Sequence, residues 1–274
     1  MPELPEVESV RRALEGGLTG RRVCAARLLT PDVVAHPDAG AFCAALTDRR
    51  FAALSRRGKF LVAALDDGAR LVVHLRMTGR LLLVPAGEAP EAYTRAVFAL
   101  DDGQELRFAD MRRFGRLWLL RAGEEDAFTG LAKLGPEPDS PACNAAYLRT
   151  ACARSRRAVK TCLLDQGIVA GIGNIYSDEI LHAARIRPDR TACSLDSTEW
   201  DRLASCVREV MCFFTEKNIV TAEEYRRTAG KEYRNTPWLR VYGHAGEPCQ
   251  RCQTPLVRTT IGGRSSVYCP QCQR

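Results

Sequence analysis

The chain has 274 residues and carries 40 lysines and arginines against 33 aspartates and glutamates, a net charge of +7. That length allows two or three domains with buried cores, and no run approaches the roughly 18 consecutive apolar residues of a membrane-spanning helix. The first residues also lack the basic and apolar regions of a secretory signal. We therefore expect a soluble protein with no membrane partner. The excess of positive charge favours a polyanionic partner, because it attracts anions over long range.

The N-terminal half begins with one predicted helix and continues as strands. Val7, Val10 and Leu14 recur at helical spacing within the opening segment, which predicts a helix there. Short apolar runs joined by tight connections such as Asp102-Gly103 then predict strands, and their number is typical of a sandwich or barrel. The predicted strands are residues 71–75, 80–84, 96–100, 105–108 and 116–120.

A proline-rich stretch separates this half from a helical one. Pro136, Pro138 and Pro141 lie close together, which indicates a linker and a domain boundary near residues 130–142. Apolar residues then recur at helical spacing on three successive faces. These faces are Val159, Cys162, Leu163 and Val169, then Ile175, Ile180 and Leu181, then Trp200, Leu203, Val207 and Met211. Residues 214–245 show no clear period.

The last segment has the pattern of a zinc site. Two Cys-x-x-Cys pairs are formed by Cys249, Cys252, Cys269 and Cys272. Each pair offers two thiolates, and the loop between them returns the second pair to the same ion, so we predict one structural Zn²⁺. Gly262 and Gly263 within that loop suit the turn of a β-hairpin. The other cysteines lack paired spacing and are expected to be reduced core thiols. They are Cys24, Cys43, Cys143, Cys152, Cys162, Cys193, Cys206 and Cys212.

Two segments are rich in arginine and suit phosphate groups. Residues 249–274 contain four arginines and no acidic residue, and a rigid hairpin would present Arg264 outward to a phosphate. The alternative is a purely structural ribbon. The glycines of residues 171–174 permit a tight turn whose N–H groups face an anion at the next helix. A basic run precedes this turn, and the alternative to a phosphate site is that its side chains form a solvated surface. Its members are Arg154, Arg156, Arg157 and Lys160.

Two predicted turns carry side chains suited to a wedge. HLRMTG contains Met77, and FADMRRFGRLW contains Arg112 and Phe114 before a glycine. Apolar side chains with a nearby arginine can fill the gap left when a base leaves a nucleic-acid stack. The alternative is that these side chains belong to the core.

The N-terminus offers a nucleophile. Pro2 is small enough for removal of Met1, which would leave a secondary amine. Glu3 and Glu6 follow it directly, and Lys59 lies after a turn in SRRGKFLV. The alternative for either carboxylate is a favourable interaction with the helix dipole.

Taken together, these segments closely resemble the bacterial formamidopyrimidine-DNA glycosylases. The similar segments span nearly the whole chain and read MPELPEVESVRR, RRGKFL, HLRMTGRL, DMRRFGRLW, LGPEP, VKTCLLDQGIVAGIGNIYSDEIL, VYGHAGEPC and the terminal CQRC to CPQCQR. The resemblance implies an α+β fold: an N-terminal β-sandwich with flanking helices, a helical helix-two-turns-helix domain and a C-terminal β-hairpin zinc ribbon. The implied domains are residues 1–131, 132–216 and 246–274, with a lesion-capping loop and connector at 217–245.

The resemblance also implies an activity in base excision repair. Such an enzyme is a bifunctional glycosylase and abasic-site lyase on double-stranded DNA, removing formamidopyrimidines and 8-oxoguanine, and we expect a cytoplasmic monomer that works at the nucleoid. By resemblance, Pro2 is the nucleophile and Glu3 the acid that protonates the sugar. Lys59 would assist elimination, and Arg264 would grip phosphate and assist the second elimination. The implied DNA contacts are Met77, Tyr93, Arg112, Phe114, Arg156, Lys160 and Asn174.

Two departures from the family pattern bear on specificity. Tyr93 stands where a DNA-contacting histidine is expected. Residues 221–240 replace the glycine-containing closing loop, and their GKEYRN lacks its second glycine, so we expect an altered preference among lesions.

Two other functions share part of this pattern. An endonuclease VIII-like enzyme for oxidised pyrimidines typically begins PEGPE and lacks the RRFG wedge. A non-catalytic zinc-ribbon DNA-binding protein would not need Pro2, Glu3 and Lys59 together.

Overall fold

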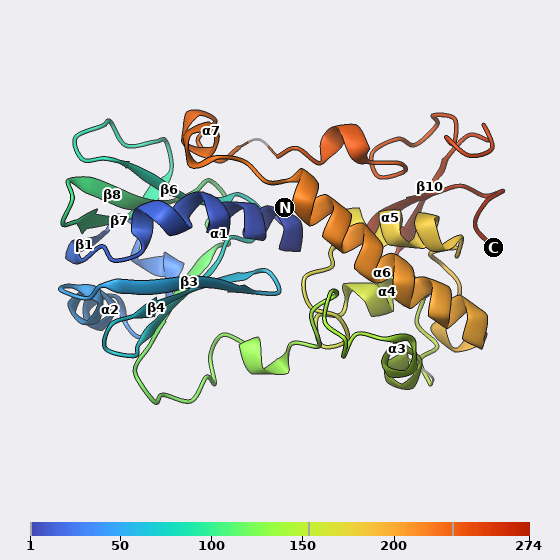
Figure 1. The fold of residues 1–274 in the computed structure, drawn as a ribbon, viewed down its shortest axis with the longest axis horizontal. Helices are drawn as coiled ribbons and strands as arrows, with labels where there is room; N and C mark the ends of the chain where they lie inside the picture. Colours follow the sequence, from blue (N-terminus) through green and yellow to red (C-terminus); the bar gives the residue numbers. More distant parts are fainter. Residues whose placement is uncertain (1, 153, 232) are drawn as a thin grey trace. The chain divides into compact units, whose positions relative to one another are not determined.

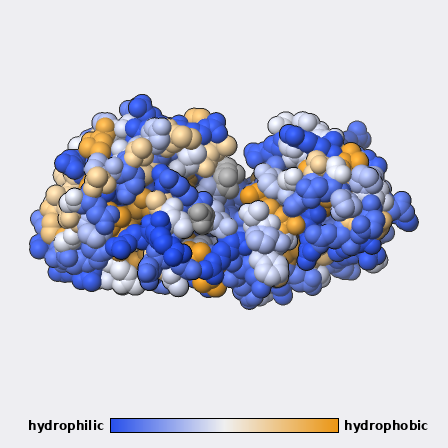
Figure 2. Space-filling view, turned by 90° about the horizontal axis from the view of Figure 1, so that it is seen from above, coloured by the Kyte–Doolittle hydropathy of each residue, from blue (hydrophilic) through white to orange (hydrophobic). Residues whose placement is uncertain are grey.

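The computed structural model describes residues 2–152, 154–231 and 233–274. The chain folds as two compact units, one of residues 1–132 with 218–234 and the other of residues 133–217 with 235–274 (Figure 1). Within the described residues, no helix has the length and apolar character needed to span a membrane. Hydrophilic residues cover most of the face drawn in Figure 2, and apolar residues appear there in small groups.

The first unit is built on two sheets. One has the strand order β1-β7-β8-β6 and the other β2-β9-β5-β4-β3. Neighbouring strands are antiparallel except for the parallel pair β2 and β9. The first sheet comprises β1 (Val23–Leu28), β6 (Gly79–Pro85), β7 (Thr94–Leu100) and β8 (Gln104–Asp110). The second comprises β2 (Val34–His36), β3 (Phe51–Arg57), β4 (Phe60–Leu65), β5 (Arg70–His74) and β9 (Arg116–Leu120).

One hydrophobic core joins the two sheets and the first helix. Phe98 and Phe108 of one sheet belong to the same buried cluster as Leu61 and Val73 of the other, which confirms the predicted sandwich. Its helices are α1 (Leu4–Leu18), the 3-10 turn η1 (Pro31–Val33) and α2 (Ala39–Leu46). The apolar stripe predicted for the N-terminal helix is buried in this core, because an amphipathic helix is stabilised mainly by packing that stripe.

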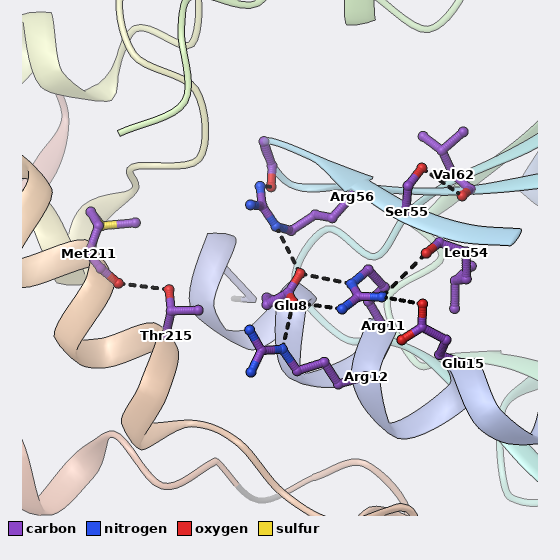
Figure 3. A network of polar contacts seen from close by, with 11 residues as sticks. Glu8, Arg11, Arg12, Glu15, Leu54, Ser55, Arg56, Val62, Met211 and Thr215 are labelled. Carbon is purple, nitrogen blue, oxygen red and sulfur yellow. Dashed lines mark hydrogen bonds and ion pairs between the residues drawn. The ribbon is translucent and has the colours of Figure 1, made fainter. Parts of the chain in front are cut away.

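Charged side chains hold α1 against β3. Glu8 accepts hydrogen bonds from Arg11 at 3.0 Å, from Arg12 at 2.7 Å and from Arg56 of β3 at 3.4 Å (Figure 3). Arg11 also pairs with Glu15 at 2.7 Å. Burial raises the pKa of Glu8, but the bonds from Arg11 and Arg12 outweigh burial and hold that pKa below its usual range.

The second unit is helical and ends in a hairpin. Its main helices are α3 (Ala145–Cys152), α4 (Val159–Leu164), α5 (Asn174–Ala184) and α6 (Ser197–Lys217), with the 3-10 turns η3 (Ala192–Ser194) and η4 (Thr236–Trp238). The 3-10 turn η2 (Leu131–Lys133) lies where the chain passes from the first unit to the second. The hairpin pairs β10 (Val257–Ile261) with β11 (Arg264–Tyr268). Gly262 and Gly263 turn it with φ of 55° and 74°, as predicted from their residue type.

The segment without a sequence period contains short elements. Helix α6 continues to Lys217, and α7 (Ala222–Arg227) follows in the first unit. Thr221 starts α7, and its Oγ1 accepts from Glu224 N at 3.1 Å. A six-residue helix spans fewer than two turns, so it leaves no periodic pattern to detect.

Candidate active site and metal centre

Pro2 lies at the wall of a hollow in the first unit. The hollow has a volume of about 560 Å³ and is lined from β6, from the connection between β6 and β7, and from residues 229–231 and 233. Pro2 itself is buried. A concave site of this volume holds a small ring system with its surroundings. Met1, whose removal we expect, lies outside the described residues.

Two buried carboxylates follow Pro2. Glu3 is 1% exposed and Glu6 is 2% exposed, and they form a capping box at the start of α1. The Glu3 backbone N–H donates to Glu6 Oε2 at 2.8 Å. Glu6 Oε1 accepts from Asn218 Nδ2 at 3.0 Å, and Asn218 O accepts from Ser9 Oγ at 2.7 Å. The start of α1 is therefore tied to residue 218, far away in sequence.

Lys59 occupies the turn between β3 and β4. It follows Gly58, whose φ is 54°, and its side chain is 7% exposed. Burial lowers the pKa of His74 to about 3, and the charges of Arg76 and Lys59 act in the same direction. His74 is thus a neutral imidazole beside Lys59, and its Nδ1 accepts from Arg76 N at 3.0 Å.

Asp110 orders the two turns that carry the predicted wedge. It is fully buried and accepts from the Thr78 hydroxyl, from Gly115 N at 2.7 Å and from Arg112 N at 3.2 Å. Position 115 requires glycine, because a Cβ there would lie 2.6 Å from the ring of Phe108. The sequence patterns described above miss Asp110, although an aspartate directly before a turn is a known signal for side-chain bonds to turn N–H groups.

The structure brings the three wedge residues together on the surface. Met77 is 43% exposed and Phe114 is 50% exposed. Arg112 Nη1 lies 2.9 Å from Met77 Sδ, and its guanidinium lies 4.9 Å from the centroid of the Phe114 ring. These exposures exclude the alternative that the side chains belong to the core.

Two tyrosines from distant parts of the sequence line the hollow. Tyr93 is exposed, has a φ of 74° and lies with its ring 5.7 Å from the Arg95 guanidinium. Tyr233 lies in the part of the chain that returns to the first unit after α6. Burial raises the pKa of Tyr233 well above its ordinary value, so its hydroxyl remains protonated and able to donate a hydrogen bond at neutral pH.

Residues 218–234 belong to the first unit. Tyr225 of α7 is 3% exposed and belongs to the same core as the two sheets. Arg80 Nη1 of β6 donates to Ala229 O at 2.7 Å. These contacts place the residues after α7 beside the hollow.

In the second unit, Asn174 lies against the ribbon hairpin. Its Nδ2 donates to Ser265 O at 2.9 Å, and the same oxygen accepts from Lys160 Nζ at 2.9 Å. Lys160 also pairs with Asp178 at 2.7 Å, with both side chains fully buried. Burial raises the pKa of Asp178 most strongly, and the Lys160 charge opposes that rise. The ammonium of Lys160 therefore holds the hairpin to α4 and α5, because a buried carboxylate requires a counter-charge. The phosphate contact implied for Lys160 stays a prediction.

Two arginines of this unit are exposed as expected. Arg264 begins β11 directly after the hairpin turn, and Arg156 lies between α3 and α4. A Cβ on Gly262 would lie 3.3 Å from Thr161 Oγ1, so the tip rests on α4. The structure thus brings Asn174 and Arg264 to the same hairpin.

The four predicted zinc ligands converge. Their Sγ atoms lie within 4.8 Å of one another, with Cys249 to Cys272 at 4.0 Å and Cys252 to Cys269 at 3.5 Å. Thiolates around tetrahedral zinc, at Zn–S distances of about 2.3 Å, lie about 3.8 Å apart. The cluster therefore fits one zinc ion.

Three family profiles match successive parts of the chain. They are the formamidopyrimidine-DNA glycosylase N-terminal domain over residues 1–117, the formamidopyrimidine-DNA glycosylase H2TH domain over 134–223 and the zinc finger found in FPG and IleRS over 246–274. The formamidopyrimidine-DNA glycosylase of Geobacillus kaustophilus is 44% identical over 275 residues, which cover 100% of both chains. The chain belongs to the formamidopyrimidine-DNA glycosylase family.

Solved structures from this family share the fold. The complex of Lactococcus lactis FPG (MutM) with Fapy-dG-containing DNA has a TM-score of 0.88 at 30% identity, covering 99% of this chain and 100% of that one. The complex of Lactococcus lactis Fpg with DNA containing an abasic site has a TM-score of 0.89 at 30% identity and covers 99% of each chain. The expected α+β fold is confirmed. The family's zinc finger coincides with the four-cysteine cluster, so the protein holds one structural zinc.

Proposed function

We propose that the protein is a bifunctional DNA glycosylase and abasic-site lyase that removes formamidopyrimidines and 8-oxoguanine from double-stranded DNA in base excision repair. One observation carries the proposal: Pro2 borders a hollow in the first unit, and the buried Glu3 and Glu6 follow it on a fixed helix start. Membership of the family supports the substrate class. The enzyme works as a cytoplasmic monomer at the nucleoid.

Catalysis begins at the amine of Pro2 after removal of Met1. An α-amino group has a pKa of about 8, so part of it is neutral at pH 7. Its lone pair attacks the anomeric carbon, and the glycosidic bond breaks with its electron pair leaving on the base. Opening of the sugar ring then gives an iminium ion. This electron sink acidifies the proton on the neighbouring carbon, so its removal expels the 3′ phosphate, and a second elimination expels the 5′ phosphate.

Glu3 supplies the proton for ring opening. A general acid must lie within hydrogen-bond reach of the sugar oxygen that it protonates. Glu3 directly follows the nucleophile Pro2 in the sequence and is buried. Glu6 is a positioning residue, since it binds the Glu3 backbone and Asn218. Lys59 assists the elimination, and the neutral His74 beside it adds no competing charge.

DNA contacts are shared between the two units. Met77, Arg112 and Phe114 fill the space vacated by the lesion nucleotide, since an exposed apolar pair around a guanidinium can intercalate. The phosphate contacts are Arg156, Asn174, Arg264 and Tyr93. Arg264 also assists the second elimination, while Lys160 acts indirectly by fixing the hairpin that carries it.

The three domains comprise residues 1–131, 132–216 and 246–274, and residues 217–245 form a capping segment and connector. Packing of residues 218–234 with the first unit supports the capping role. Tyr233 on the wall of the hollow is placed to offer the extruded base a hydrogen bond.

Borohydride trapping tests the nucleophile. The mature protein is mixed with an abasic-site duplex and sodium borohydride, and the cross-linked peptide is identified by mass spectrometry. We expect the adduct on Pro2, and Pro2→Gly should lose most of it. An adduct on Lys59 in the wild type refutes the assignment, and absence of any adduct favours a non-catalytic DNA-binding protein. Excision measured on 8-oxoguanine, formamidopyrimidine and dihydrouracil separates the proposal from an endonuclease VIII-like activity.

A further inference from the structure

The second unit contains a groove apart from the residues assigned to DNA. It has a volume of about 710 Å³ and lies among α5, α6, the η4 turn and the first zinc knuckle. Figure 1 shows the chain after η4 running alongside α5, and the backbone N–H groups of residues 240–242 bind Glu179 of that helix. The groove is thus framed by well-anchored elements.

Two exposed aromatic side chains line the groove. Trp238 is 38% exposed and Phe213 is 37% exposed, and their ring centroids lie 5.7 Å apart at 84°. The ammonium of Lys217 lies 4.4 Å from the Trp238 centroid and 5.5 Å from that of Phe213. Tryptophan is enriched at the centres of protein interfaces, where it supplies a large apolar contact.

The charge of the groove is positive. Arg240 and Arg251 on its wall are exposed, and Arg251 is held by a bond from its Nη1 to His182 O at 3.1 Å. Glu179 is 3% exposed and is turned to backbone N–H groups, so it does not offset these charges at the surface. Glu209 is an exposed acidic residue of the lining. With Lys217, the cations outnumber that carboxylate.

We propose that this groove docks an acidic peptide segment of a partner protein, with an aromatic or large aliphatic side chain seated against Trp238 and Phe213. Guanidinium groups match carboxylates in a two-bond geometry, so Arg240 and Arg251 bind acidic side chains flanking that anchor. A nucleic-acid strand is the other anionic occupant, and the competition experiment below separates it from a peptide.

Selection from random peptides tests the groove while its partner protein is unidentified. The bait is the zinc-loaded full chain, saturated with a duplex carrying a tetrahydrofuran abasic analogue that covers the DNA-binding residues. Random dodecapeptides displayed on phage are selected on this bait and on an Arg240→Glu bait. We expect the wild-type bait to enrich peptides with Asp or Glu around an aromatic or aliphatic residue. Absence of that enrichment, or equal enrichment on both baits, overturns the proposal.

The consensus peptide is then labelled with fluorescein and titrated by anisotropy. Trp238→Ala and Arg240→Glu should each weaken peptide binding about tenfold or more. The matched control is Arg149→Glu, since Arg149 is also exposed in the same unit. Displacement of the peptide by single-stranded oligothymidylate would assign the groove to nucleic acid and overturn the proposal. Arg240 is exposed, so Arg240→Glu should fold normally. This variant therefore tests peptide binding even if Trp238→Ala does not fold.

Discussion

At the scale of single residues, burial separated side chains that the sequence pattern treated alike. Lys160 and Arg156 both belong to one basic run, yet Lys160 is fully buried against Asp178 while Arg156 faces solvent. Met77 and Phe114 are apolar, yet both are exposed around Arg112. The wedge is therefore a surface feature, held in place by the buried Asp110 beneath it.

Replacing Phe114 by alanine should slow excision from duplex DNA more than elimination at a preformed abasic site. Unstacking a base costs a few kcal/mol, and an inserted apolar side chain offsets part of that cost. We expect single-turnover excision to fall about tenfold or more, which corresponds to about 1.4 kcal/mol. Phe128→Ala is the matched control, because Phe128 is also 50% exposed and stacks on His36. Equal loss in both reactions would contradict the wedge.

At the scale of elements, an ion-pair network and a metal site hold together segments that apolar burial alone does not hold. The Glu8 network ties α1 to β3 (Figure 3), and zinc ties the two knuckles of the ribbon. Both belong to elements with a proposed chemical role, since Glu3 caps α1 and the ribbon carries Arg264.

Glu8→Gln should destabilise the protein in a pH-dependent way. The folded-state pKa of Glu8 is lowered, so its ionised form contributes stability above the unfolded pKa of about 4.3, and that contribution is lost as pH falls through the folded value. We expect a loss of about 1.5–3 kcal/mol in the free energy of unfolding at pH 7, shrinking below about pH 4. Urea unfolding at several pH values measures it. Glu15→Gln, at a more exposed carboxylate with one partner, should cost about 0.5 kcal/mol. A constant difference across pH would rule out this role.

Cys269→Ser should release zinc and unfold the ribbon. Structural zinc binding contributes folding free energy directly, whereas the first unit has its own core. We expect loss of bound zinc, much weaker DNA binding and an unchanged unfolding transition of the first unit. Elemental analysis and DNA titration measure the first two, and far-ultraviolet circular dichroism follows the third. Retention of zinc and DNA affinity would show that the ribbon does not depend on the metal.

At the scale of the whole molecule, the chain leaves the second unit after α6 and contributes residues 218–234 to the first. This excursion brings Asn218 to Glu6 and Tyr233 to the hollow that Pro2 borders. Residues from this segment therefore lie beside the proposed chemistry.

Tyr233→Phe should change the preference between lesions rather than the overall rate. A site that hydrogen-bonds a polar group of the base discriminates strongly against analogues that lack the group. This discrimination is stronger than the shape of the pocket alone can give. We expect kcat/KM for 8-oxoguanine and for formamidopyrimidine to change by different factors, about fivefold or more apart. Tyr242→Phe, in the second unit, is the control. An equal change for both lesions and for dihydrouracil would show that Tyr233 does not read the base.

The sequence by itself determined the family, the strands and helices with strong periodicity, the zinc ligands and the proposed nucleophile. These depend on local patterns: a Cys-x-x-Cys spacing, a glycine pair in a turn, or a proline after the initiator methionine. Only the tertiary structure decided that Lys160 is buried, that Asp110 orders both wedge turns and that Glu6 binds Asn218. Each of these depends on burial and on contacts between residues far apart in the chain, which no single stretch of sequence records.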